Sequence, residues 1–425
     1  MYPFNEFSPR YPSCLASLLL LATVLTGFGV QLALADDIQP PRPFKVKPRL
    51  ETNGLGGLAP PSADVVKEMH ASQYILHARD GKLTKVPVEK ILLPHANQTN
   101  PQNVNIFQAP DGTIWVDNGR LCKSTDGGRT WAAHERDRSF NAHFLQALDN
   151  GTLIAMGDEG EHPHTRIIFL TSSDEGRSWK KISEIPNPSK RHWGGGSYLY
   201  RLPDGMLIAG IGHPDHVFEQ TDKGLVLKSG GGALQIYRST DNGLTWTDNG
   251  PVHDWTSEGD LTVTASGKLF ASHRYQRPPL PGDPPDLEKQ TGSISPGWPY
   301  KHLLTMESMD NGLTWQNIQM ITSVFGQTRG APVALSDGTV IVIHDTRYGP
   351  GPAGSRAMIS RDEGVTWEDE VYYMDYSTFV GCYADSIALD DDTVLSLVAS
   401  SQAGNSWSAV ADNTDHYLIR WKPIP

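Results

Sequence analysis

The stretch STDGGRTW, residues 124–131, decides the fold because closely related stretches recur along the chain. Each copy reads Ser-x-Asp-x-Gly-x-Thr/Ser-Trp and follows a run of alternating apolar and polar residues, a pattern typical of a strand. Asp accepts hydrogen bonds from backbone N–H groups ahead of it, Gly adopts a left-handed conformation at little cost, and Trp begins the next strand. The stretch therefore predicts a hairpin turn with Trp packed over it; a catalytic or metal-binding role is the less favoured alternative. The other copies are residues 172–179, 239–246, 308–315 and 360–367.

A second repeat, a strand, a tight turn and a strand, is interleaved with the first. The first five of its six copies are each followed by the D-x-G hairpin, so each unit predicts a four-stranded antiparallel sheet. Repeated sheets of this size indicate an all-β fold, a six-bladed β-propeller. The six copies lie at about 109–116, 146–156, 200–210, 263–272, 333–343 and 387–397.

The sixth unit lacks the D-x-G stretch and supplies only three strands before the chain ends. A closed ring needs a fourth strand there, because an unpaired edge is a liability. Residues 73–84, QYILHARDGKLT, are predicted to pair with the strand at 416–422. Both ends of the chain would then close the last blade.

Composition limits the classes of partner. The chain has 425 residues and a formal charge of −12, which argues against nucleic acid and leaves a small anionic substrate possible in a locally basic pocket. No His/Cys spacing resembles a zinc site and no phosphate-binding loop is present, so neither a metal nor a cofactor is expected.

The N-terminus has the pattern of a secretory signal peptide. Arg10 precedes a long apolar run that ends in Ala33-Leu34-Ala35, a small-x-small cleavage pattern. We expect residues 1–35 to be removed, 36–63 to form a Pro/Gly-rich linker and 64–425 to form the propeller. The mature protein would be secreted or periplasmic and would not be held in a membrane; an uncleaved membrane anchor is the alternative.

Removal of the signal peptide leaves two cysteines, Cys122 and Cys382. Two are too few for a disulfide framework. They either pair or remain buried thiols, and buried thiols are the default in a chain of this size. Nothing in the sequence fixes the oligomeric state.

The five D-x-G stretches in a six-unit all-β chain resemble the Asp-box (BNR) repeats of the sialidase (neuraminidase) superfamily, over roughly residues 73–424. The resemblance implies a glycoside hydrolase that removes a terminal acidic sugar of sialic-acid type. In this family a neutral Tyr attacks the anomeric carbon, a Glu takes its proton, three Arg grip the substrate carboxylate, and an Asp serves as acid/base.

Four positions match the family pattern. Glu258 and Arg274 are 16 residues apart on a strand–turn–strand unit, which brings them to one end of a blade. Arg356 precedes the last D-x-G stretch, and Tyr383 begins the last blade. The resemblance makes Tyr383 the nucleophile, Glu258 its base, and both arginines the clamp. Taken singly, each residue also has a structural interpretation in loop solvation, rim packing or an ion pair.

Two positions depart from the pattern. The family's first clamp Arg is replaced by Asn105, and the loop that normally carries the acid/base Asp is short. Asp117 is the nearest replacement for that Asp, and His143 is the alternative. Arg329, at the start of blade five, is the candidate third cation.

These departures leave three functions open. The leading one is a sialidase-type hydrolase. The second is another glycan-active enzyme, a lyase or glycosidase of uronic-acid polysaccharide, with His143 or His344 as acid/base. The third is a non-catalytic glycan-binding propeller.

Overall fold

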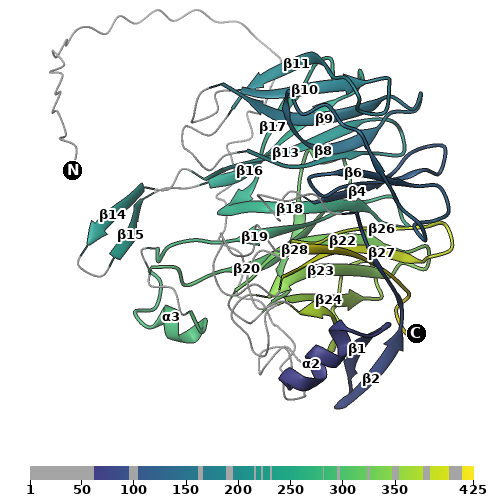
Figure 1. Ribbon diagram of the computed structural model, residues 1–425. Coiled ribbons are helices and arrows are strands. Elements are labelled where there is room, and N and C mark those ends of the chain that lie inside the picture. The colour runs from purple at the N-terminus through teal and green to yellow at the C-terminus, as the bar shows by residue number, and fades with distance from the viewer. Residues whose placement is uncertain are drawn as a thin grey trace, which may run out of the picture. The chain divides into compact units, whose positions relative to one another are not determined.

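The computed structural model describes most of the chain from residue 62 onward, and its regular secondary structure is nearly all β-strand (Figure 1). Within these residues no helix has the length and apolar character needed to cross a membrane. The predicted signal peptide, most of the predicted linker and Cys382 lie outside the described residues. Those residues are 62–94, 104–160, 166–187, 195–214, 217–221, 224–229, 232–280, 282–293, 297–322, 326–346, 354–376, 383–401 and 414–425.

The strands form six four-stranded antiparallel blades of a β-propeller, as the sequence predicts. Blade one contains β4 (Asn105–Gln108), β5 (Ile114–Asp117), β6 (Leu121–Ser124) and β7 (Ala132–His134). Blade two contains β8 (Asn141–Ala147), β9 (Leu153–Glu159), β10 (Arg166–Ser172) and β11 (Lys180–Pro186). Blade three contains β12 (Gly195–Arg201), β13 (Leu207–Pro214), β16 (Gly232–Ser239) and β17 (Thr247–Asp254).

Blades four to six follow the same order. Blade four contains β18 (Thr256–Val263), β19 (Leu269–Tyr275), β20 (His302–Ser308) and β21 (Gln316–Met320). Blade five contains β22 (Gln327–Ala334), β23 (Val340–Thr346), β24 (Gly354–Ser360) and β25 (Glu370–Tyr376). Blade six contains β26 (Asp385–Ala388), β27 (Val394–Ser401), β28 (Thr414–Trp421) and β3 (Glu89–Leu92).

The first strand of each blade contacts the first strand of the next, and β26 contacts β4, which closes the ring. The apolar core is divided among the seams between neighbouring blades. Ile154 and Phe169 of blade two, for example, pack with Leu207 of blade three. Burial of these side chains makes each blade depend on its neighbours for stability.

The closing strand differs from the one that the sequence predicted. β28 pairs with β3, in which Leu92 faces Tyr417, and not with residues 73–84. That segment forms the hairpin of β1 (Tyr74–Arg79) and β2 (Lys82–Pro87), and β1 adds to the outer edge of blade five. The prediction that both chain ends complete blade six is correct, but the donor strand lies further along the chain.

The chemistry of β1 explains this correction. His77 Nε2 donates a hydrogen bond to Glu370 Oε1 at 3.0 Å, and its ring stacks on Tyr372 with centroids 4.4 Å apart. Ile75 and Leu76 are buried. Blade five thus offers β1 both an ionisable partner and an apolar surface, whereas the short β3 is sufficient to cover the edge of blade six.

Three further elements lie outside the blades. Helix α2 (Ala63–His70) begins directly after Ser62, whose hydroxyl accepts a hydrogen bond from the Val65 N–H. It packs against β1 and β25. An additional hairpin of β14 (Val217–Thr221) and β15 (Gly224–Ser229) interrupts blade three, and α3 (Leu287–Gln290) lies in the Pro-rich insertion of blade four.

The D-x-G turns have the structural role that the sequence predicts. In the third copy, Asp241 accepts hydrogen bonds from the Thr245 N–H at 2.9 Å and the Thr245 hydroxyl at 2.6 Å. These bonds lower the pKa of Asp241. Trp246 packs back over the turn, donates to the Gly243 carbonyl at 3.2 Å and stacks on Phe169.

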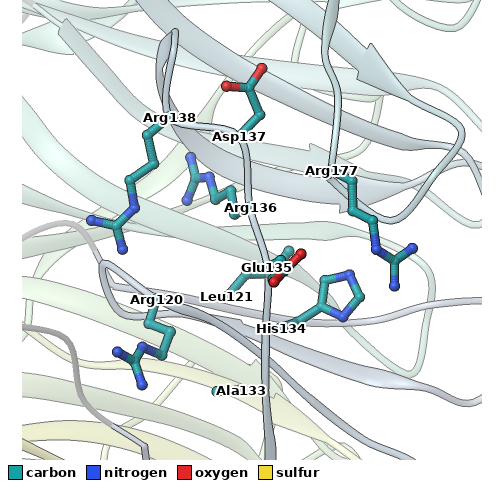
Figure 2. A pocket seen from close by; sticks show the side chains of 9 residues that line it. All are labelled: Arg120, Leu121, Ala133, His134, Glu135, Arg136, Asp137, Arg138 and Arg177. Atoms are coloured by element: carbon teal, nitrogen blue, oxygen red, sulfur yellow. The ribbon is translucent and has the colours of Figure 1, made fainter.

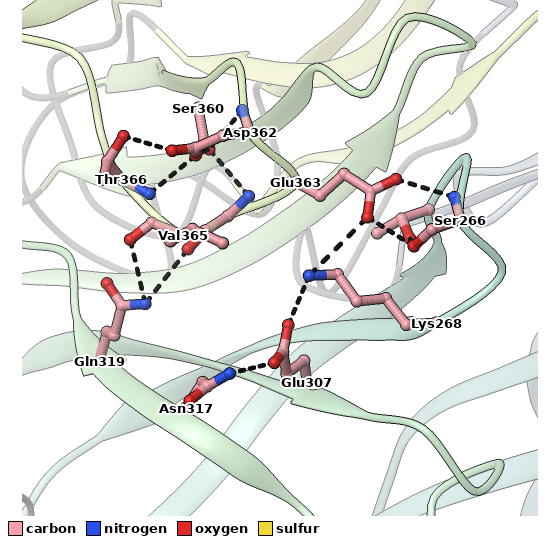
Figure 3. Close-up of polar contacts among 12 residues, drawn as sticks. Ser266, Lys268, Glu307, Asn317, Gln319, Ser360, Asp362, Glu363, Val365 and Thr366 are labelled. Carbon is pink, nitrogen blue, oxygen red and sulfur yellow. Dashed lines mark hydrogen bonds and ion pairs between the residues drawn. The ribbon is translucent and has the colours of Figure 1, made fainter.

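Each turn also packs against the preceding blade. Gly243 has φ of +84°, and a Cβ there would lie 2.6 Å from the side chain of Ile154 in blade two. Figure 3 shows the fifth turn, where Glu363 accepts a hydrogen bond from the Ser266 N–H of blade four at 2.8 Å. Gln319 of blade four donates to the Gly364 carbonyl at 3.2 Å. The repeated stretch therefore joins adjacent blades as well as adjacent strands.

Candidate active site

Tyr383 and Glu258 meet across the ring. Glu258 lies on β18 of blade four, at an irregularity in its pairing with β19, and Tyr383 lies two residues before β26 of blade six. The Tyr383 hydroxyl donates a hydrogen bond to Glu258 Oε2 at 2.7 Å. The short distance expected from the sequence is therefore confirmed for two residues 125 positions apart.

Arg274 joins the same carboxylate. It lies near the end of β19, and its Nη1 donates to Glu258 Oε2 at 2.6 Å. Its Nη2 donates to the side-chain oxygen of Gln276. One oxygen of Glu258 thus accepts hydrogen bonds from both the Tyr383 hydroxyl and the Arg274 guanidinium, which stabilises the ionised carboxylate that a base requires.

Arg329 adds a second cation beside the tyrosine. Its guanidinium carbon lies 5.2 Å from the centroid of the Tyr383 ring and 6.0 Å from that of Phe144. The side chain is buried, and its backbone N–H donates to Asp345 Oδ1 at 2.8 Å. This placement agrees with the prediction that Arg329 belongs to the same site, and a cation over an aromatic face is an attractive contact.

Beneath the tyrosine lies a pair of carboxyl groups that the sequence did not single out. Asp260 is two residues after Glu258, and Asp385 is two residues after Tyr383. The two carboxyl groups lie close enough for each to influence the pKa of the other. Burial raises the pKa of both groups, that of Asp260 most strongly because Asp385 lies beside it, and the Arg329 guanidinium opposes the rise. The raised pKa favours the protonated form of these carboxyl groups, most strongly that of Asp260.

Blade one meets this pair through Asn105, which stands where the family pattern has its first clamp Arg. The Asn105 amide donates to Asp385 Oδ2 at 3.3 Å, and its carbonyl oxygen accepts from the Leu145 N–H at 2.8 Å. The Ile106 N–H also donates to Asp385 Oδ2, at 2.8 Å. Asn105 therefore ties blade six to blades one and two.

Asp117 is the register partner of Asn105 on β5. It is buried and accepts a charge-assisted hydrogen bond from Arg136 Nη1. Its other oxygen accepts from the Gly119 N–H at 3.2 Å. The predicted acid/base candidate is thus held by an arginine that the sequence did not single out.

The remaining predicted residues lie in blades two and five. The His143 Nε2 is 3.6 Å from Asp158 Oδ2, and the His143 side chain is 18% exposed. Arg356 is buried, with its guanidinium carbon 5.3 Å from the centroid of the Tyr373 ring. His344 is its register partner on β23 and is buried, which lowers the pKa of His344 to about 4. A clamp formed jointly by Arg356 and Arg274 stays a prediction.

Two smaller predictions concern cysteine and metal. Cys122 is a buried thiol whose Sγ donates to the Pro94 carbonyl at 3.5 Å, and burial raises its pKa to about 11. Among the residues that the structure describes, no group of three or more His, Cys, Asp or Glu side chains is placed to hold a metal ion.

A simple periodicity could have indicated the missed carboxyl pair. Residues i and i+2 of a strand point to the same face. Asp260 and Asp385 therefore share a face with the two residues that the family pattern identified. Arg136 offered no comparable signal, because it lies in the irregular connection between blades one and two.

Comparisons with known proteins agree with the architecture. No protein-family model matches the chain. A xyloglucanase from a Paenibacillus species is 25% identical over 268 residues, which cover 59% of this chain and 23% of that protein. The chain thus spans about a quarter of the length of this relative.

Two solved structures are similar in fold. A protein of unknown function from Dyadobacter fermentans has a TM-score of 0.54 and 16% identity, covering 79% of this chain and 98% of that one. The Hadza microbial sialidase Hz136 has a TM-score of 0.49 and 16% identity, covering 74% of this chain and 65% of that one. The propeller fold is shared with the Dyadobacter protein.

Proposed function

We propose that this protein is a glycoside hydrolase that removes a terminal acidic sugar, of sialic-acid type, from glycans. The observation that carries the proposal is the hydrogen bond from Tyr383 to Glu258, with Arg274 on the same carboxylate oxygen. A Tyr hydroxyl paired with an ionised Glu is a nucleophile that stays neutral until the moment of reaction. A sugar that carries a carboxylate on its anomeric carbon would repel a carboxylate nucleophile, so this pair suits such a sugar.

In the proposed reaction Tyr383 Oη attacks the anomeric carbon while its proton passes to Glu258. The glycosidic oxygen leaves with a proton from the acid/base. Water then attacks the anomeric carbon while the acid/base takes its proton, and the Tyr383 oxygen leaves and regains its proton from Glu258. Arg274, Arg329 and Arg356 are the proposed cations for the substrate carboxylate, since a guanidinium fork matches a carboxylate. Asp117 is the proposed acid/base, provided that its carboxyl turns away from Arg136, and His143 is the substitute.

A second function, cleavage of a uronic-acid polysaccharide by a lyase or another glycosidase, is favoured by one observation. Asn105 replaces the first clamp arginine and is already bonded to Asp385 and Leu145. His143, partly exposed and beside Asp158, is better placed to act as the base than the buried His344. A propeller that binds glycans without cleaving them is the third possibility.

The protein's proposed place of action is outside the cytoplasm, secreted or periplasmic, because residues 1–35 have the pattern of a signal peptide. A glycan on a cell surface or in the surroundings is a substrate consistent with that location.

The mature protein should be tested on chromogenic α-sialosides and on uronic-acid glycans, with Tyr383→Phe as the inactive control. We expect release of the chromophore and of a free acidic sugar. Products with an unsaturated, ultraviolet-absorbing end would instead identify a lyase. Binding of the glycans without turnover would identify a binding propeller.

A further inference from the structure

A basic pocket lies beside blade one. It is separate from the group formed by Tyr383, Glu258, Arg274 and Arg329, here called the Tyr383 cluster. It encloses about 570 Å³ and is lined by the end of β7, the connection that follows it and the D-x-G turn of blade two (Figure 2). Four arginines line it, Arg120, Arg136, Arg138 and Arg177. None of the pocket's residues is a member of the Tyr383 cluster.

The charge of this pocket opposes that of the whole chain. The residues that line it include four arginines and two carboxylates, Glu135 and Asp137, a formal balance of +2 before the carboxylates outside the lining are counted, in a protein with a net charge of −12. A concave surface of one sign concentrates ligands of the opposite sign even when the net charge is unfavourable. The pocket is therefore suited to an anion.

Two of the arginines are available to such a ligand. Arg120 and Arg138 are exposed, and within the described part of the chain neither forms an ion pair with a carboxylate. Among the described residues, the acceptor of the Arg138 guanidinium is a neutral group, the Gly119 carbonyl, at 2.6 Å. In Figure 2 Arg120 and Arg138 lie on the same side of the connecting segment.

The other two arginines are already engaged. Arg136 binds Asp117, and Arg177 lies 3.6 Å from Glu175. They hold the wall of the pocket in place and leave the guanidinium groups of Arg120 and Arg138 as its binding elements.

The pocket is connected to the candidate active site through a continuous series of contacts. Arg136 binds Asp117, and Asp117 is the register partner of Asn105. Asn105 binds Asp385, which follows Tyr383 by two residues. The pocket therefore adjoins the same blade as two residues of the candidate site, and a glycan is the class of ligand to test there.

We propose that this pocket binds an acidic group, a carboxylate or a sulfate, on an anionic glycan. Arginine suits both groups because its planar fork donates paired hydrogen bonds to two oxygens. A polynucleotide is a poorer ligand, because it needs an extended basic face rather than one pocket. The assignment concerns binding and does not require the hydrolysis proposed above.

The test measures the affinity of the full-length mature protein by calorimetry in a Tyr383→Phe background, which keeps the probe uncleaved. The probes are a galacturonic acid hexasaccharide, a sulfated maltohexaose and neutral maltohexaose. The variant is Arg120→Gln/Arg138→Gln. The matched control is Lys82→Gln/Arg166→Gln, which makes the same change in net charge at two exposed positions outside the pocket.

We expect at least one acidic probe to bind. The pocket variant should weaken that binding about tenfold or more, because it removes charge-assisted hydrogen bonds to the ligand, and the loss of one such bond lowers affinity by about this factor. The control should change the affinity by less than about twofold, because salt screens exposed charges that lie outside the pocket. Which probe responds distinguishes a carboxylate site from a sulfate site. Arg120→Gln alone, which breaks no recorded hydrogen bond, should show part of the loss and guards against misfolding.

Three results would overturn the proposal: neither acidic probe binds, the pocket variant binds like the parent, or the control loses as much affinity as the pocket variant. A failure of the proposed hydrolysis would be seen separately, as absence of turnover by the unmodified protein, and would leave these affinities unchanged.

Discussion

The two sides of the candidate site are built differently. Blades four and six bring Glu258, Arg274 and Tyr383 together as the family pattern predicts, around a single carboxylate oxygen. On the side of blade one, Asn105 replaces an arginine, and Asp117 is bound by Arg136. One side is arranged as the proposed nucleophilic attack requires, whereas the polar side chains of the other side bind their own neighbours.

This difference separates the choice of reaction from the choice of substrate. The Tyr–Glu pair determines how a glycosidic bond would be broken. The residues of blade one determine which group beside that bond can be held, and a site that loses one arginine holds a carboxylate less tightly. We therefore expect the mechanism to follow the sialidase pattern more closely than the substrate does.

The largest effect should come from the side that matches. We expect Tyr383→Phe to lower kcat on an acidic aryl glycoside by about 10³-fold or more, because no nucleophile remains. The ring stays packed, so the melting temperature should change little. Tyr300→Phe, which removes a phenol hydroxyl elsewhere in the propeller core, is the control. Activity of Tyr383→Phe within tenfold of the parent would show that Tyr383 is not the nucleophile.

Arg274→Lys tests the clamp on the same side. An ammonium can keep one ion pair with Glu258 but cannot form a fork, so we expect kcat/KM to fall by about 10- to 100-fold. Arg277→Lys is a matched control, because Arg277 lies three residues on and forms a fork with Asp283 at 2.5 and 2.9 Å. Steady-state kinetics and thermal melts should show lost activity for the first variant and lost stability for the second. Equal kinetics for both would remove Arg274 from the clamp.

Asp117→Asn examines the side that departs. If Asp117 donates the proton to the leaving group, its loss should matter for a natural glycan and much less for an aryl glycoside, whose leaving group needs no proton. We expect kcat/KM to fall by about 100-fold on the glycan and under tenfold on the aryl substrate. The same ratio measured for His143→Gln assigns the role to the histidine. An equal loss on both substrates for both variants would exclude each of them as the acid.

Asp260→Asn should have the smallest effect, and it is on stability. The pKa of Asp260 is raised in the folded protein, so the stabilisation from its protonated form is complete below about pH 4 and is lost as the pH rises through the raised value. An amide can still donate to Asp385 and accept from the Leu261 N–H without titrating. In urea unfolding at several pH values, we expect the free energy of unfolding to fall less between pH 4 and pH 8 in the variant than in the parent. The difference should be about 1.4 kcal/mol for each unit by which folding raises the pKa of Asp260. Parallel curves would show that no proton is held there.

The repeated turns made the fold predictable from the sequence. Each D-x-G stretch has a local geometry that its own residues fix, as Asp241 and Trp246 show, and counting the copies gives the blades. The closing strand was mispredicted because pairing of β1 depends on Glu370 and Tyr372, nearly 300 residues away. A local pattern carries no information on such a choice between two edges.

The candidate site was predictable only where a spacing pattern applies. Glu258 and Arg274 lie on neighbouring strands of blade four, and Tyr383 lies two residues before the first strand of blade six, so their convergence follows from the propeller. Arg136 lies in an irregular connection, and its contact with Asp117 depends on the path of that segment through space. The basic pocket could not be predicted from the sequence for the same reason, because the same connection lines it.

A covalent bond between Tyr383 and the sugar is the central step of the proposed mechanism, and trapping tests it most directly. An acidic aryl glycoside with fluorine beside the anomeric carbon slows both steps, and its activated leaving group lets the first step outrun the second. Mass spectrometry of the digested protein should then show one added sugar on the peptide that contains Tyr383, and none on the Tyr383→Phe protein. A sugar attached to Glu258 or to another residue, or turnover of this glycoside with no adduct at any time, would contradict the account.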